Sequence, residues 1–187
     1  IYVGWGAAGA SEEIIRIAEL LGAPVCTTLQ GKATFPASHP LHTGFGFGPN
    51  AVPASQEAFK NCDAMLAVGV RFSEIGTGTY GVKVPENLIH IDINSKVFKK
   101  NYPSKISVEA DAKEALGSLA KILENSKTQK NSSQLKALIL KDKEAHAKEM
   151  KKGFHKEIVS PGYFFESLEK HTDSDTFFVV DDGWHTY

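Results

Sequence analysis

The stretch IYVGWGAAGASEEIIRIAELLG, residues 1–22, decides the fold of this 187-residue chain. Three apolar residues, 1–3, run directly into a glycine loop, 4–9, with the spacing G-x-G-x-x-G. A helix is predicted over residues 11–22, because isoleucine, alanine and leucine recur there at helical spacing and a glycine ends it. Residues 24–28 form a second apolar strand, so the start of the chain is a βαβ unit with parallel strands.

Further apolar runs extend this unit into a larger sheet. Residues 64–69 form a nearly continuous apolar strand, typical of a strand covered on both faces, and 88–92 and 106–108 are two more strands. Residues 31–53 are dense in Gly, Pro, His and Phe without any period, which predicts a long surface loop lining a site. The pattern is that of an α/β, doubly wound parallel sheet of the Rossmann-like type.

Composition changes along the chain predict three regions. Residues 1–125 form a nucleotide-binding domain that closes with a helix begun by a capping box of Asp111 and Glu114. Residues 126–159 form a linker that carries a Lys- and Glu-rich helix from about 134 to 152. Residues 160–187 then start a second α/β domain, with a helix opening at SPG and a strand at FFVV, residues 177–180. The apolar beginning without Met leads us to expect a piece of a longer protein.

The totals limit the classes of function. Lys plus Arg number 21 and Asp plus Glu 22, so no overall positive field favours nucleic acid or an acidic membrane surface. No apolar run reaches the roughly 20 residues that span a bilayer. The two cysteines, Cys26 and Cys62, fit free buried thiols of a reducing compartment, so we expect a cytoplasmic location. His39 and His42 lie in the irregular segment without partnered carboxylates, which argues against a metal site there.

The glycine loop is the first candidate for ligand binding. Glycines allow a tight turn and let phosphate oxygens approach backbone N–H groups at a helix N-terminus. The second strand ends in Thr27 and Thr28, with no acid to bind a ribose 2′-hydroxyl, which argues against NAD. The alternative is that the glycines serve only the packing of helix against strand.

Three charged residues follow later elements of the predicted sheet. Arg71 comes after the central strand, where its planar guanidinium suits a phosphate or an electron-rich ring, although a surface ion pair is the alternative. Asp92 ends the strand 88–92 and is the obvious acid for a ribose. Asp111 either contacts the ligand or only caps its helix. Spacing alone therefore leads to a nucleotide and no further.

Five motifs in order resemble one family, the acetolactate synthase group of thiamine-diphosphate enzymes, in its large catalytic subunit. They are YVGWG (residues 2–6), TTLQGK (27–32), FP with HPL (35–36 and 39–41), AVGVRF (67–72) and IHIDI (89–93). The resemblance covers residues 1 to about 123 as the central domain, of the DHS-like NAD/FAD-binding domain type. Residues 160–187 resemble the opening of the diphosphate-binding domain.

The resemblance implies a thiamine-diphosphate- and Mg²⁺-dependent transferase or lyase of branched-chain amino acid biosynthesis. Such an enzyme decarboxylates pyruvate and joins the product to a second 2-keto acid. It implies a homodimer or homotetramer with a possible small regulatory subunit. The activating glutamate and the Mg²⁺ ligands belong to other parts of such an enzyme, so we expect no catalytic residue in this chain and no activity of the chain alone.

The family also implies cofactor contacts. For FAD or another nucleotide these are Gly4, Trp5, Gly6, Thr28, Leu29, Gln30, Gly31, Gly69, Val70, Arg71, Phe72, Asp92, Ile93, Asp111 and Ala112. For thiamine diphosphate they are Trp184 and His185, in a turn where Trp184 replaces the usual amide.

Two departures from the family pattern bear on whether the chain binds flavin. Flavin-binding synthases follow the Arg-Phe pair with Asp-Asp-Arg, where this chain has SEI at residues 73–75, and Pro49 stands where the family often carries His. FAD, ADP and an empty crevice all remain open. Two other functions also remain. One is a different thiamine-diphosphate 2-keto acid decarboxylase or carboligase, of the glyoxylate carboligase or benzoylformate decarboxylase type. The other is a stand-alone nucleotide-binding module.

Overall fold

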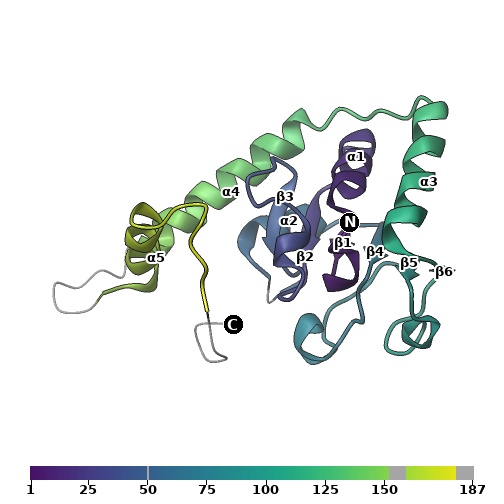
Figure 1. The fold of residues 1–187 in the computed structure, drawn as a ribbon, viewed down its shortest axis with the longest axis horizontal. Helices are drawn as coiled ribbons and strands as arrows, with labels where there is room; N and C mark the ends of the chain where they lie inside the picture. Colours follow the sequence, from purple (N-terminus) through teal and green to yellow (C-terminus); the bar gives the residue numbers. More distant parts are fainter. Residues whose placement is uncertain (50, 152–158, 180–187) are drawn as a thin grey trace. The chain divides into compact units, whose positions relative to one another are not determined.

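The computed structural model describes residues 1–49, 51–151 and 159–179. The chain forms two compact units, residues 1–143 and 144–187, and each is described by itself. The first unit contains a six-stranded parallel sheet (Figure 1). Its strands are β1 (Tyr2–Val3), β2 (Val25–Thr27), β3 (His42–Phe45), β4 (Ala64–Val68), β5 (Asn87–Asp92) and β6 (Ile106–Glu109).

The strand order is β3-β2-β1-β4-β5-β6, and every neighbouring pair is parallel. This is the order of a doubly wound dinucleotide-binding fold, and it confirms the predicted fold class. The chain winds outward from β1 in one direction to β3 and in the other from β4 to β6. Loops therefore leave β1 and β4 toward opposite sides, which opens a crevice at the carboxyl ends of these strands.

Alternating strand residues face two separate cores. Val3, Val25 and Val68 pack with the helices α1 (Ser11–Leu21) and α3 (Ala112–Asn125). Their sequence neighbours Tyr2 and Ala67 belong to a second cluster, which includes Phe59 of α2 (Pro53–Phe59). Because successive side chains of a strand point to opposite faces, helices cover both faces of the sheet.

Local signals located the helix ends of the first unit correctly. Gly22 follows α1 with φ of +59°, the left-handed conformation that glycine adopts without a Cβ clash. The side chain of Asp111 accepts hydrogen bonds from the N–H groups of Lys113 and Glu114, so it caps α3 as the sequence indicates. α2 begins with Pro53 in its first turn, where the missing N–H of proline costs no intrahelical hydrogen bond.

The prediction of one long loop over residues 31–53 is wrong in its centre, which contains β3. This strand has four residues and pairs with β2 through an irregular register. Gly44, within it, has φ of +112°. So short a strand at the sheet edge carries too few residues for a period to be read, and its pairing with β2 defines it.

The charged helix predicted near 134–152 is α4 (Ser133–Lys151), which crosses the boundary between the two units. In the second unit, α5 (Pro161–Lys170) begins as predicted, because the Ser160 side chain accepts a hydrogen bond from Tyr163 N–H. None of the described helices is long and apolar enough to cross a membrane.

The strand predicted at residues 177–180 is absent over 177–179, and residue 180 lies outside the described part. Phe177 and Val179 are 94% and 99% exposed. An apolar run becomes a strand only when a neighbour supplies the ladder of hydrogen bonds, and none pairs with residues 177–179 among the described residues. Trp184 and His185, the predicted thiamine-diphosphate contacts, also lie outside the described residues. The predicted domain boundaries at residues 125 and 159 stay predictions.

Candidate functional site

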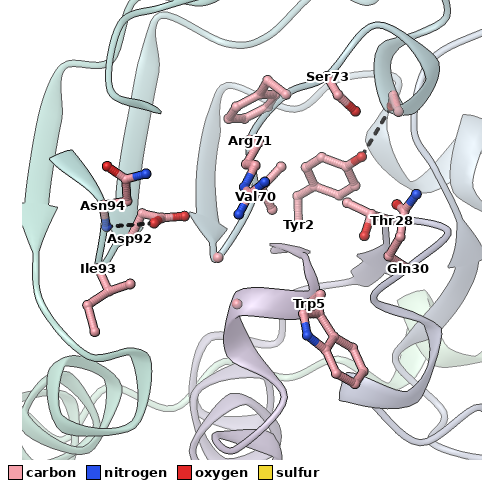
Figure 2. A pocket seen from close by; sticks show the side chains of 14 residues that line it. Tyr2, Trp5, Thr28, Gln30, Val70, Arg71, Ser73, Asp92, Ile93 and Asn94 are labelled. Atoms are coloured by element: carbon pink, nitrogen blue, oxygen red, sulfur yellow. Dashed lines mark hydrogen bonds between the residues drawn. The ribbon is translucent and has the colours of Figure 1, made fainter. Parts of the chain in front are cut away.

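A crevice of about 600 Å³ lies at the carboxyl ends of β1, β2, β4 and β5 (Figure 2). Its size is within the range of small-molecule and cofactor sites. It is lined by Tyr2, Trp5, Gly6, Thr28, Gln30, Gly69, Val70, Arg71, Phe72, Ser73, Gly76, Asp92, Ile93 and Asn94. Parallel strands end on the same side of a sheet, which is why residues from four separate stretches meet here.

The glycine loop packs closely against the turn that follows β4. The N–H of Gly4 donates to the Val68 carbonyl at 2.9 Å, and that of Gly6 donates to the Gly69 carbonyl at 3.3 Å. A Cβ on Gly4 would lie 2.1 Å from the Gly69 oxygen, so no larger residue fits. Packing is thus one function of these glycines, and these two N–H groups are not the phosphate donors that the G-x-G-x-x-G pattern predicts.

The N-terminus of α1 is also unsuited to a phosphate. Its first turn carries Glu12 and Glu13. Acidic side chains there interact favourably with the positive end of the helix dipole, and they repel a second anion. Among the residues that line the crevice, the cationic one is Arg71.

Arg71 is exposed and lies in the turn after β4. Among the described residues it forms no salt bridge, which leaves its guanidinium available to a ligand. The surface ion pair considered as an alternative is not observed within that part of the chain. Its neighbours Val70 and Phe72 are buried and anchor the backbone on both sides of it.

Asp92 ends β5, the strand that pairs with β4 in the sheet. Its Oδ1 accepts the N–H of Asn94 at 2.9 Å, which fixes the carboxylate at the crevice (Figure 2). A carboxylate held this way can accept hydrogen bonds from vicinal hydroxyls such as those of a ribose. Ile93 is 71% exposed beside it, an apolar surface that a ligand would cover.

The remaining predicted contacts divide into two groups. Thr28 and Gln30 line the crevice, whereas Leu29 and Gly31 do not. The Thr28 hydroxyl accepts the Gly31 N–H at 2.9 Å and shapes this turn after β2. Asp111 and Ala112 begin α3 and are not among the lining residues either. The only contacts of the Asp111 side chain within the described residues are those of a helix cap.

The sequence did not predict that four further residues line the crevice, which are Tyr2, Ser73, Gly76 and Asn94. Tyr2 is buried, and its hydroxyl donates to the Gly76 carbonyl at 3.2 Å across 74 positions of sequence. Burial raises the pKa of this phenol, so the hydroxyl stays protonated and keeps donating. A tyrosine within a short apolar strand gives no local sign of such a partner. Only the tertiary fold brings it beside the loop after β4.

The expectation for the two histidines of the segment 31–53 is wrong in two respects. His42 is the first residue of β3 and does not lie in an irregular segment. His39 does have a carboxylate partner, because its Nε2 lies 3.5 Å from Glu19 of α1. His42 is 8% exposed, and both its ring nitrogens are buried without a hydrogen-bond partner in the described part of the chain. Burial, followed by the charge of Lys143, lowers the pKa of His42 to about 4. No group of three or more metal-ligating side chains occurs among the described residues.

Comparison with known proteins connects this crevice to a family. Residues 1–119 match the family described as thiamine pyrophosphate enzyme, central domain. The chain belongs to the thiamine pyrophosphate enzyme family. Thiamine pyrophosphate is the same compound as thiamine diphosphate. The matched residues include β1 to β6 and most of α3, so the central domain of this family is the doubly wound unit described above.

Relatives within this thiamine pyrophosphate enzyme family confirm the resemblance to acetolactate synthases. The chain is 44% identical over 112 residues to a probable acetolactate synthase large subunit of Methanocaldococcus jannaschii, covering 59% of this chain and 19% of that protein. It is 30% identical over 191 residues to the acetolactate synthase large subunit of Corynebacterium glutamicum, covering 99% of this chain and 30% of that protein. Acetolactate synthase 1 of Zea mays is 36% identical over 132 residues, 70% of this chain and 20% of its own length. The chain thus spans about a fifth to a third of these relatives.

Proposed function

We propose that this chain is the central part of a thiamine-diphosphate-dependent enzyme that makes acetolactate. In that reaction pyruvate loses CO₂, and the remaining two-carbon unit joins a second 2-keto acid. The observation that carries the proposal is the alignment with the Corynebacterium large subunit, which extends over 99% of the chain and beyond the central domain. Thiamine diphosphate supplies the electron sink for such chemistry, and protein groups supply position and electrostatics.

This chain itself has a supporting role in the proposed reaction. No catalytic residue is expected within it, and its predicted thiamine-diphosphate contacts, Trp184 and His185, lie outside the described residues. The glutamate that activates thiamine and the Mg²⁺ ligands are expected elsewhere in the whole enzyme. We therefore infer that the isolated chain forms no acetolactate.

We further propose that the crevice binds a nucleotide, FAD or ADP. Asp92 would accept hydrogen bonds from a ribose, and Arg71 would pair with a phosphate. The exposed indole of Trp5 offers a flat surface to a planar ring. The acidic first turn of α1 argues that the phosphates lie toward Arg71 and away from that helix.

Family resemblance also supports the proposals about the whole protein. We infer a cytoplasmic homodimer or homotetramer, with a possible small regulatory subunit, acting in branched-chain amino acid biosynthesis. Light scattering of the full-length enzyme checks the oligomer. A monomer at micromolar concentration would contradict it.

An activity assay tests the reaction. The full-length enzyme with thiamine diphosphate and Mg²⁺ should form acetolactate from pyruvate, whereas the 187-residue chain should form none. Glyoxylate and benzoylformate serve as competing substrates. If the full-length enzyme prefers either one, its function is the corresponding carboligase or decarboxylase activity and not acetolactate synthesis. Acetolactate formed by the 187-residue chain alone would contradict the inference that the chain is inactive.

A binding titration tests the nucleotide site. Calorimetry of the chain with ADP and with FAD should detect binding to the wild type. Arg71→Ala should weaken it by about tenfold or more, because a charge-assisted contact is lost. Arg71→Lys is the matched control, since it keeps the charge and loses the planar fork, and an intermediate loss is expected. Absence of heat with either nucleotide, and of a flavin absorbance band in the full-length enzyme, would exclude the site.

A further inference from the structure

The turn that presents Arg71 has a strained backbone. Gly69 has φ of +61° and Phe72 has φ of +48°. The left-handed region costs free energy for any residue with a Cβ, and Phe72 has no glycine-like freedom. Such a conformation persists only when its surroundings hold it, and it is often found where a functional side chain must be aimed.

Hydrogen bonds from three separate segments hold this turn. Four of its carbonyl oxygens, counting the last residue of β4, accept a donor from elsewhere in the fold. These are Val68 from Gly4 N–H at 2.9 Å, Gly69 from Gly6 N–H at 3.3 Å, Val70 from His90 Nε2 at 2.7 Å and Phe72 from Asn101 Nδ2 at 2.9 Å. The backbone is thus fixed on both sides of Arg71, while the Arg71 side chain remains exposed.

His90 makes the shortest of these four contacts. It lies on β5, is 1% exposed and does not line the crevice. A carbonyl oxygen can only accept, so Nε2 carries the hydrogen and the ring is in the tautomer that donates from this nitrogen. Edge-to-face contacts with Phe72 and Phe98, at 5.3 and 5.1 Å between ring centres, set the orientation of the ring.

We propose that His90 is a positioning residue, which holds the strained turn so that Arg71 faces the crevice. Its hydrogen bond fixes the carbonyl immediately before Arg71, and its ring packs against the strained residue immediately after it. His90 thus acts on both neighbours of Arg71 without reaching the ligand. This inference rests on the proposed function only in taking Arg71 as the group that binds the nucleotide phosphate.

A first experiment tests the turn without any ligand. Hydrogen exchange of the 187-residue chain reports two amides at this turn: Gly6, which donates to the Gly69 carbonyl, and Gly69, which donates to the Ile91 carbonyl of β5. His90→Leu should raise their exchange rates by about tenfold, because one buried donor is lost. His90→Gln is the matched control, since its amide N–H can reach the same carbonyl, and it should stay within about twofold of the wild type. Amides of α1 should be unchanged in both variants.

Unchanged exchange of Gly6 and Gly69 in His90→Leu would overturn the proposal. Equal acceleration in His90→Leu and His90→Gln would also overturn it, because the hydrogen bond would then not be the cause. If His90→Leu does not fold, His90→Met provides an apolar side chain of more adaptable shape for the same comparison.

A second experiment asks whether His90 acts through Arg71. ADP affinity is measured by calorimetry for the wild type, His90→Leu, Arg71→Ala and the double variant. His90→Leu should weaken binding by about fivefold to tenfold in the wild type and by less than twofold when Arg71 is already alanine. Equal losses in both backgrounds would show that His90 does not act through Arg71. If the wild type binds neither ADP nor FAD, the proposed nucleotide site fails, and hydrogen exchange still decides whether His90 holds the turn.

Discussion

At the scale of one residue, Gly69 shows that the close packing of the two loops at the crevice requires residues without a side chain. Its φ is +61°, and a Cβ there would lie 2.5 Å from the Gly6 carbonyl carbon. Gly69→Ala should therefore lower the free energy of unfolding by about 2 kcal/mol or more, from backbone strain and from separation of the two loops. Urea denaturation measures the change.

Gly117 is the matched control for that substitution. It lies inside α3, and a Cβ there meets nothing within 4 Å. Gly117→Ala should stabilise the chain by about 0.5 to 1 kcal/mol, because glycine in a helix loses more backbone entropy on folding. Equal stability of the two variants would mean that the loops do not pack as described.

Trp5 gives a second prediction at this scale. Its indole is 64% exposed at the crevice, and the chain has only one other tryptophan. ADP or FAD should quench its fluorescence, and Trp5→Ala should weaken nucleotide binding by roughly 1 to 3 kcal/mol if the base stacks on it. Trp5→Phe should abolish the quenching and retain most of the affinity. A Trp5→Ala variant that binds like the wild type would exclude stacking.

Asp111 tests a helix end at the scale of one element. Its side chain accepts two backbone N–H groups at the start of α3. Asp111→Ala should lower the free energy of unfolding by about 1 kcal/mol, whereas Asp111→Asn should retain most of the cap. Thermal denaturation compares the two. Because Asp111 does not line the crevice, ADP affinity should be unchanged in both variants. A loss of ADP binding in either variant would instead identify Asp111 as a ligand contact.

Elements differed in how far they could be predicted. α1 and α3 were predictable because periodicity and caps are properties of a few neighbouring residues. β3 was not, since its four residues are defined by pairing with β2. At residues 177–179 the error was the opposite one: a strand was predicted and none is present. Residues with the composition of a strand form none unless a neighbouring strand pairs with them.

Acid should destabilise the molecule as a whole through His42. Burial lowers its pKa in the folded chain to about 4, from an ordinary value near 6.5 in the unfolded chain. The unfolded state therefore binds the proton first, and the stability present above pH 6.5 is lost as the pH falls toward 4, by about 1 to 2 kcal/mol when solvent screening of the ring is included.

His42→Leu removes this titration. Urea denaturation at pH 7 and pH 4.5 should show a smaller difference in the free energy of unfolding for the variant than for the wild type. Burial also lowers the pKa of His90, so some acid sensitivity should remain in the variant. Identical pH dependence in the two proteins would mean that His42 is accessible to protons in the folded state.

The sequence by itself determined the βαβ start, the parallel doubly wound class, the caps of α1 and α3 and the candidate residues Arg71 and Asp92. Each of these follows from periodicity, capping or position at a strand end, which involve residues close together in the chain. Only the tertiary structure decided what the glycine loop does. It packs Gly4 and Gly6 against Gly69, and the N–H groups of Gly4 and Gly6 donate to the carbonyls of Val68 and Gly69.

The contacts of Tyr2 with Gly76 and of His90 with Val70 were likewise decided by the fold. The physical reason is that a hydrogen bond across the sheet depends on strand order and register. Neither is encoded in any short stretch of residues, because the pairing of β1 with β4 brings together segments that are far apart in the chain.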